Sequence, residues 1–178
     1  YYFIGKIYLF GIGIDQDLNK AFENLQAGTS HGDLDAINGL AVLYSMDNFV
    51  DFDIQKSMHF YKLASENGNV KSLYNLGMIY LYGKGVPKDT SKAISLIQKS
   101  ANFGFKAAQY QMGIFYITGT GVEKSDKLAF DYIKKAADQD FPEAILELGD
   151  MYANGNGVSK NPELAFLEYQ KAMEFNDT

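Results

Sequence analysis

One pattern recurs along this chain at a fixed interval. The run at 76–86 reads Leu-Gly-Met-Ile-Tyr-Leu-Tyr-Gly-Lys-Gly-Val, and related runs start at Met112 and Leu148, so the spacing is 112 − 76 = 148 − 112 = 36 residues. With weaker copies nearer the N-terminus, the unit occurs about five times in 178 residues without insertion or deletion. A fixed period of this length is typical of repeat proteins, in which each unit packs against its neighbours.

The first half of each unit is predicted to be a helix that ends at glycine. Over 72–82 the apolar residues fall at helical spacing, which predicts a first helix. Gly83 and Gly85 then end it, because glycine adopts a positive φ at little cost. An Ile or Val follows in every unit and is predicted to be a buried plug. These residues are Ile14, Val50, Val86, Val122 and Val158.

The second half of each unit is predicted to be a capped helix, which runs from about Thr90 to Asn102 in the central copy. A residue whose short polar side chain can accept a bond from a helix N–H precedes it in every unit. These N-cap candidates are Asp17, Asp53, Asp89, Ser125 and Asn161. The helix stops near Gly104, and the equivalent residues tolerate the left-handed conformation of a C-cap. They are Gly32, Gly68, Asp140 and Asn176. Each unit is therefore predicted to be an antiparallel helical hairpin.

Small residues indicate how the hairpins stack. Four of the five units have glycine in the middle of the first helix, where it costs about 1 kcal/mol relative to alanine. These are Gly5, Gly77, Gly113 and Gly149. The second helices carry matching small residues at Ala21, Ser57, Ala93, Ala129 and Ala165. We expect the lost helix stability to be regained through close approach of neighbouring helices.

Composition narrows the function classes. A formal net charge of -6 argues against binding to nucleic acid, which requires clustered Lys and Arg. No apolar run reaches the roughly 18 residues that span a membrane, so we expect no direct membrane insertion. The absence of cysteine excludes disulfides and thiolate metal sites. The chain opens on Tyr1-Tyr2-Phe3-Ile4, and we expect a segment of a longer array with units at about 1–35, 36–71, 72–107, 108–143 and 144–178.

The repeating pattern resembles the Sel1-like repeat, a relative of the tetratricopeptide repeat. The residues that carry the match in the central unit are Leu76, Gly77, Tyr80, Gly83, Gly85, Val86, Asp89, Lys92, Ala93, Ala101 and Gly104. Tetratricopeptide repeats have a 34-residue period and are the weaker match. The resemblance covers nearly the whole chain. It implies an all-α, right-handed solenoid whose first helices line the concave side, and a non-catalytic role as adaptor or scaffold for proteins.

A finer resemblance rests on the Gly-poor turn Met46–Asp51 and the run 76–86. Together they are similar to Sel1-like arrays that serve as lumenal adaptors of ubiquitin ligases in endoplasmic-reticulum-associated degradation. This resemblance implies the endoplasmic reticulum as compartment. The alternatives are a bacterial or protozoan Sel1-like protein in signalling or host interaction, secreted, periplasmic or cytoplasmic, and a self-associating structural spacer.

If the first helices line a groove, residues three and four apart on their outward stripe face a partner. The predicted groove residues are Val42, Met46, Lys71, Tyr74, Met78, Tyr82, Tyr110 and Ile114. Glu143, Glu147 and Asp150 would form an acidic end. An apolar floor rich in Met and aromatic residues suits an extended or helical peptide segment. The alternative is that Val42, Met78 and Ile114 belong to the core between repeats.

Self-association is a further alternative, which would give a homodimer. It would use the irregular turn at Asp47, Asn48 and Phe49, or the open end Tyr1–Ile4, in a two-fold interface.

Enzyme chemistry finds no support in the sequence. The only histidines, His31 and His59, lie in different predicted helices, and neither has a metal-ligand partner at helical spacing. Gly83-Lys84-Gly85 lacks the Gly-x4-Gly-Lys-Ser/Thr pattern of a phosphate-binding loop, and we interpret it as a turn. We therefore predict no catalytic residue, no cofactor and no metal site. A hydrolase, the rival class, would need a convergent polar pocket.

Overall fold

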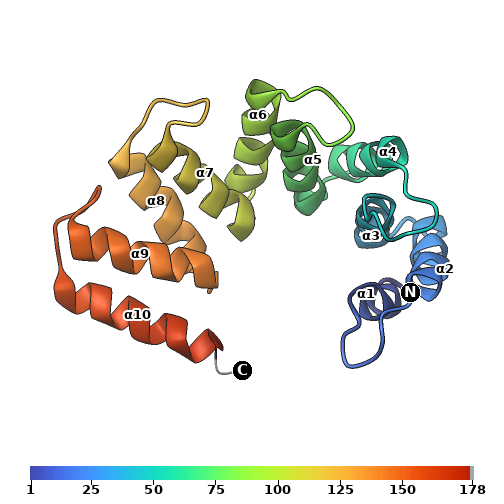
Figure 1. The fold of residues 1–178 in the computed structure, drawn as a ribbon, viewed down its shortest axis with the longest axis horizontal. Helices are drawn as coiled ribbons and strands as arrows, with labels where there is room; N and C mark the ends of the chain where they lie inside the picture. The colour runs from blue at the N-terminus through green and yellow to red at the C-terminus, as the bar shows by residue number, and fades with distance from the viewer. Residues whose placement is uncertain (177–178) are drawn as a thin grey trace. The chain divides into compact units, whose positions relative to one another are not determined.

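The computed structural model describes residues 1–176, which form ten α-helices joined by short connections (Figure 1). The helices are α1 (Tyr2–Phe10), α2 (Leu18–Ser30), α3 (Leu34–Tyr44), α4 (Ile54–Glu66), α5 (Val70–Tyr82), α6 (Thr90–Asn102), α7 (Lys106–Thr118), α8 (Asp126–Ala137), α9 (Pro142–Asn154) and α10 (Pro162–Asn176). None of the described residues lies in a strand, so the predicted all-α class is confirmed. The expected end of the fifth unit at Thr178 lies outside the described residues.

The helices group into two compact units. The first unit is Tyr1–Lys88 and holds α1 to α5, and the second begins at Asp89 and holds α6 to α10. In the first unit, α1 packs on α2 and α3 on α4, and α2 and α4 also pack against the helix that follows them. In the second unit, α7 packs on α8 and α9 on α10, while α6 contacts α7 and α8 contacts α9. Packing between consecutive helices is what a repeat array requires.

The helix caps confirm the sequence prediction. All five N-cap candidates accept a hydrogen bond from a main-chain N–H in the first turn of the helix that follows. Helix α5 starts at Val70 rather than Ser72, because Asn69 caps it by accepting a bond of 3.0 Å from the N–H of Ser72. Asp140, just beyond α8, has a φ of 55°, so it takes the left-handed conformation expected of its position.

Mid-helix glycines lie where helices come closest. A Cβ atom at Gly113 would lie 2.5 Å from Cδ1 of Ile133, and one at Gly5 would lie 2.7 Å from Cγ of Leu25. Neither position has room for a methyl group. The small residues predicted to face such contacts are buried, and they are Ala21, Ser57, Ala93, Ala129 and Ala165. The predicted close approach is confirmed within both units.

The turn between α3 and α4 differs from the prediction at Phe49. Asp47 and Asn48 are exposed, as a projecting loop requires. Phe49 is only 4% exposed, because its ring packs with centroid distances of 5.9 Å against both Phe22 and Tyr44. Phe49 is therefore a core residue of the first unit and not a surface contact for self-association.

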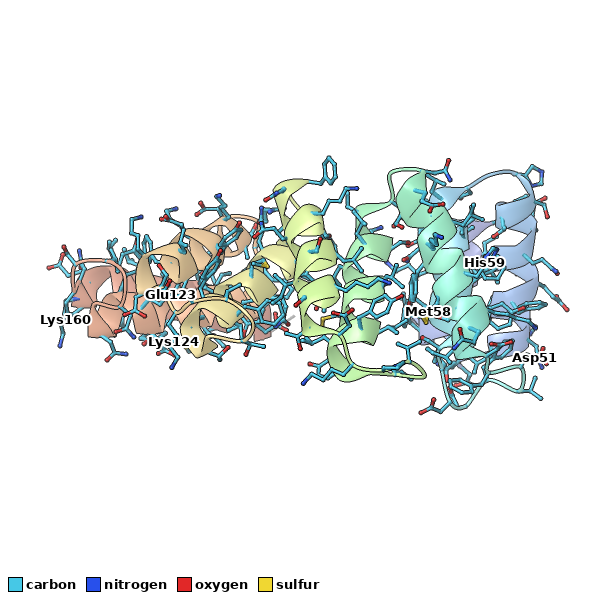
Figure 2. All side chains as sticks on the ribbon, turned by 90° about the horizontal axis from the view of Figure 1, so that it is seen from above. Asp51, Met58, His59, Glu123, Lys124 and Lys160 are labelled. Atoms are coloured by element: carbon cyan, nitrogen blue, oxygen red, sulfur yellow. The ribbon has the colours of Figure 1, made fainter. Side chains whose placement is uncertain are left out.

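The predicted buried plug is wrong for the first two copies. Val50 is 84% exposed, because Phe49 beside it takes the interior position, and Ile14 is exposed as well. The three later copies, Val86, Val122 and Val158, are half-buried. Asp51, labelled in Figure 2, follows Val50 in the same loop and is also exposed.

Candidate partner-binding surface

The partly exposed face of α5 carries the largest share of the predicted groove residues. Lys71, Tyr74, Met78 and Tyr82 recur along it at helical spacing, and Tyr82 at its end is 73% exposed. The Nζ atom of Lys71 lies 3.0 Å from Oδ1 of Asp35 on α3, so this lysine ties the two first helices together. An exposed pair of this kind contributes at most about 1 kcal/mol to stability.

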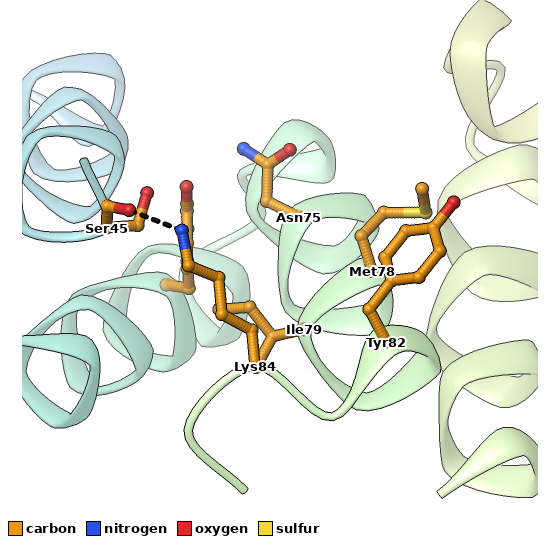
Figure 3. Close-up of a pocket in the computed structure, with 7 residues that line it drawn as sticks. Ser45, Asn75, Met78, Ile79, Tyr82 and Lys84 are labelled. Atoms are coloured by element: carbon orange, nitrogen blue, oxygen red, sulfur yellow. Dashed lines mark hydrogen bonds between the residues drawn. The ribbon is translucent and has the colours of Figure 1, made fainter. Parts of the chain in front are cut away.

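The structure brings two of these residues, Met78 and Tyr82, into one pocket with residues that the sequence prediction did not include. The pocket has a volume of about 210 Å³ and is open to solvent (Figure 3). Its lining residues are Ser45, Tyr61, Asn75, Met78, Ile79, Tyr82 and Lys84. Ligand pockets usually measure about 300–1,000 Å³. The space therefore suits a single side chain better than a cofactor.

One end of the pocket is polar. The side chain of Tyr61 is buried, and burial raises the pKa of its phenol well above the usual value, although hydrogen bonds with Ser45, Asn75 and Ser57 oppose this shift. The phenol therefore stays protonated at all ordinary pH values and can donate a hydrogen bond.

The amide of Asn75 connects this end of the pocket to a polar cluster beneath. Its Nδ2 atom donates to Oδ1 of Asn38 at 3.3 Å, and the hydroxyl of buried Ser72 donates to the same oxygen at 2.9 Å. Buried polar groups must be hydrogen-bonded to avoid a desolvation penalty, and these partners satisfy each other. The Asn75 side chain is thereby held in place from below.

Lys84 forms the rim of the pocket beside Ser45. Its ammonium donates to the main-chain oxygen of Ser45 at 2.7 Å, and Figure 3 marks this bond. It also lies 3.6 Å from a carboxylate oxygen of Asp47. Ser45 is the C-cap residue of α3, where unpaired carbonyls leave a partial negative charge. Lys84 offsets that charge at a turn that has no glycine cap.

These contacts do not form a nucleophile–base pair. The hydroxyl of Ser45 donates to the carbonyl of Val42 at 2.6 Å, and Lys84 bonds to the main-chain oxygen of Ser45 rather than to its hydroxyl. Activation of a serine requires a base within hydrogen-bond reach of the hydroxyl proton. In these contacts the Ser45 hydroxyl donates to a main-chain carbonyl and not to a side-chain base.

The other predicted groove residues pack against the core clusters of the two units. Val42 and Met46 are half-buried against the core cluster of the first unit, and Tyr110 and Ile114 pack in the same way against the core cluster of the second. For Val42 and Ile114 this packing agrees with the alternative of a place in the core between repeats. The pocket includes none of these four residues.

The acidic residues predicted at one end of the groove lie on α9 of the second unit. Glu147 is half-buried, and burial together with Asp150 raises its pKa. The pKa of Tyr110 is raised by burial and by the nearby Glu147 and Glu143. Asp150 accepts a hydrogen bond of 2.7 Å from the hydroxyl of Tyr169.

The histidines lie apart from the pocket. His59, labelled in Figure 2, is exposed on α4, and Nδ1 of His31 lies 2.8 Å from the carbonyl of Ala27. Within residues 1–176, no three His, Cys, Asp or Glu side chains gather closely enough to hold a metal ion. Over the same residues, no helix is long and apolar enough to cross a membrane.

A comparison among the chain's own repeats could have marked some residues in and near the pocket as unusual. Ser72 stands where three other units have Ala36, Ala108 and Ala144. Ser45 stands where the other units have Leu9, Leu81, Ile117 and Ala153. Tyr61 occupies a position that is Leu25, Ile97, Ile133 and Tyr169 elsewhere. Each substitution alone is unremarkable in sequence, because positions spread over 45–75 show no common site until the helices are folded.

The comparisons with known proteins agree with this architecture. The family model of the Sel1 repeat matches residues 1–33, 34–69, 70–104, 106–141 and 142–174. The chain belongs to the Sel1 repeat family. Proteins of this family generally act as protein-interaction scaffolds and are generally non-catalytic. No match was found among curated proteins.

Solved structures of Sel1 repeat proteins are similar over nearly the whole chain. A Sel1 repeat protein from Oxalobacter formigenes is 30% identical, with a TM-score of 0.84 over 97% of this chain and 71% of that one. A protective antigen of uropathogenic Escherichia coli with the same repeat fold is 28% identical, with a TM-score of 0.78 over 96% of this chain and 36% of that one. The chain thus spans about a third of the Escherichia coli antigen. These similarities confirm the predicted α-solenoid class.

Proposed function

We propose that this Sel1 repeat chain is a non-catalytic protein-interaction scaffold that binds a segment of a partner along α5. The observation that carries the proposal is the open pocket beside the exposed ring of Tyr82. A large aromatic side chain that stays 73% exposed next to a pocket is typical of an interaction surface, where Tyr residues often dominate binding. The membership of a scaffold family supports this role.

The partner surface in this proposal runs from Lys71 through Tyr74 and Met78 to Tyr82. The four residues follow one stripe of a single helix, and such a linear surface suits an extended or helical segment. Tyr110 and Ile114 on α7 are proposed as additional contacts of the second unit, where they are half-buried.

Proximity labelling with the full-length chain in its native cell, followed by affinity measurement with the purified partner, tests this proposal. Replacing both Tyr74 and Tyr82 by Ala should weaken partner binding at least tenfold, as expected when interface hot spots are removed. Phe103→Ala, which removes a 65% exposed aromatic ring at the end of α6, is the matched control and should leave affinity unchanged. Retained affinity in a folded Tyr74/Tyr82 variant contradicts the proposal.

The narrower role as a degradation adaptor of the endoplasmic reticulum stays a prediction based on the turn Met46–Asp51 and the run 76–86. Recovery of ubiquitin-ligase components in the labelling experiment would support it. The bacterial origin of the similar solved structures favours the alternative, a bacterial Sel1 repeat protein.

Self-association is the remaining alternative, with Asp47 and Asn48 as its exposed loop residues. Light scattering of the full-length chain separates it from a monomeric scaffold.

A further inference from the structure

The pocket on α5 has features that define the side chain it can accept, and this inference rests on the proposed protein-binding role. We propose that the pocket binds a tyrosine side chain of the partner segment. The pocket's size, its charges and the placement of its polar groups support this assignment.

The charges at the rim are paired with each other and favour a neutral occupant. A carboxylate would be attracted by Lys84, but Lys84 is already paired with Asp47 and bonded at the carbonyl end of α3, both of which repel a carboxylate. An ammonium or guanidinium would meet the ammonium of Lys84. Lys84 is already paired with Asp47 and hydrogen-bonded to the Ser45 carbonyl. A charged occupant of either sign would therefore find no unpaired opposite charge at the rim. The occupant is therefore neutral.

The lining residues suit an occupant that has an apolar body and one polar end. Met78, Ile79 and the ring of Tyr82 supply apolar contact, and the Met78 thioether packs well against an aromatic ring. Asn75 and Tyr61 lie in the same pocket, and as seen in Figure 3 the Asn75 amide projects from α5 on the side of Ser45. An amide both donates and accepts, so a hydroxyl fits its bonding capacity better than the donor-only indole of Trp.

The internal repeats supply an independent reason to assign a role to these groups. Ser45, Ser57 and Ser72 replace Ala, Leu or Ile of the other units, and all three lie around Tyr61 and Asn75 or beneath them. Introducing polar groups into a repeat core costs stability, and such departures from local rules concentrate at functional sites. In the first unit these groups meet beside the pocket, whereas the buried polar replacements of the second unit, Ser100 and Gln109, do not line it.

The test uses N-acetyl-tyrosinamide as the probe and the methyl NMR signal of Met78 in the full-length chain as the readout. The signal is assigned with Met78→Leu. N-acetyl-tyrosinamide should shift it saturably, N-acetyl-phenylalaninamide should bind about three- to tenfold more weakly because it lacks the hydroxyl, and N-acetyl-glutamic acid amide should not shift it.

Asn75→Leu tests whether the polar end of the pocket selects the hydroxyl. It should reduce the affinity for the tyrosine probe to that of the phenylalanine probe and leave the latter unchanged. Gln98→Leu, which removes an amide on α6 in the second unit, is the matched control and should preserve the preference. Equal binding of the two aromatic probes, or no shift of the Met78 signal with either, overturns the inference.

Failure of the inference and failure of the proposed function give different results. If Tyr82→Ala weakens partner binding while the tyrosine probe leaves Met78 unaffected, the scaffold role stands and the pocket assignment is wrong. If the probe binds but the Tyr74/Tyr82 variant retains full partner affinity, the pocket accepts tyrosine and the α5 surface is not the partner site.

Discussion

Substitution of Gly113 by Ala tests the close helix approach on which the stacking of repeats depends. A Cβ at this position would lie 2.5 and 2.6 Å from the two outer carbons of Ile133, and 3.4 Å from the carbonyl oxygen of Ala129. Only the contacts with Ile133 are too short. Ile133 is fully buried in the core cluster of the second unit, so its side chain has no free space into which to turn.

The expected magnitude follows from two opposing terms. Overpacking of a filled core costs about 1–3 kcal/mol, whereas replacing a mid-helix glycine by alanine gains about 1 kcal/mol. Gly113→Ala should therefore lower the free energy of unfolding by up to about 2 kcal/mol, or the melting temperature by several degrees at ~2–4 °C per kcal/mol. In the background of Ile133→Ala the obstructing atoms are gone, and the same substitution should raise stability by about 1 kcal/mol.

Urea unfolding followed by circular dichroism of the four proteins in this double-mutant cycle measures the change of sign. Gly149→Ala is a matched control, because its short contact is with the ring of Tyr169, which is only half-buried and can move outward. Its cost should be smaller than that of Gly113→Ala. Equal effects of Gly113→Ala with and without Ile133 would refute the argument from close approach.

Three further predictions concern the loop, a cap and a half-buried carboxylate. Phe49→Ala should lower the free energy of unfolding by about 3–5 kcal/mol because it empties a core position, while Val50→Ala beside it, at an 84% exposed site, should change it little; urea titration compares the two. Ser125→Ala should cost about 1 kcal/mol and increase amide hydrogen exchange in the first turn of α8, because the N–H of Leu128 loses its acceptor. The pKa of Glu147 is raised by burial and by Asp150, so the stability linked to its proton is complete below the unfolded pKa of about 4.3 and is lost as pH rises through the higher folded value. Glu147→Gln should therefore stabilise the chain at neutral pH and not below pH ~4, as thermal melts at the two pH values would show.

Most of the fold could be predicted because each local sequence pattern recurs in several copies of the repeat. One N-cap residue such as Asp89 is weak evidence, but a short polar side chain at the same phase in every unit leaves little doubt about where the second helices begin. The same holds for Gly113, which faces Ile133. Glycine lowers the stability of an isolated helix, so its presence in mid-helix implies a tight contact with a neighbouring helix. At these positions the conformational preferences of single residues and the repeat period predict the same structure.

At Val50 the prediction was wrong because this copy departs from the others. Phe49 replaces a turn glycine, and from sequence alone the period suggested that Val50 next to it would point inward. The folded chain instead buries the larger ring against Phe22 and Tyr44, since a Phe side chain buries more apolar surface than a Val. A shift of one residue in the turn exchanges the buried and exposed side chains.

The pocket escaped prediction for a related reason. The groove prediction selected residues by their spacing along a single helix, and it included Met78 and Tyr82. It could not select Ser45, Tyr61 or Lys84, which come from the end of α3, from α4 and from the turn after α5. Their proximity depends on the packing of three helices.

A repeat array provides its own reference for recognising functional residues. The residue types shared by all copies, such as the N-caps and the small residues of the second helices, are explained by the demands of stacking. A polar residue that replaces an apolar one in a single copy has no such explanation, and it lowers stability unless its hydrogen bonds are satisfied. Around Tyr61 several replacements of this kind meet, satisfy each other and border an open space. Buried polar replacements also occur in the second unit, at Ser100 and Gln109, but the group around Tyr61 borders a pocket beside the exposed ring of Tyr82, which is the reason to look for the partner there.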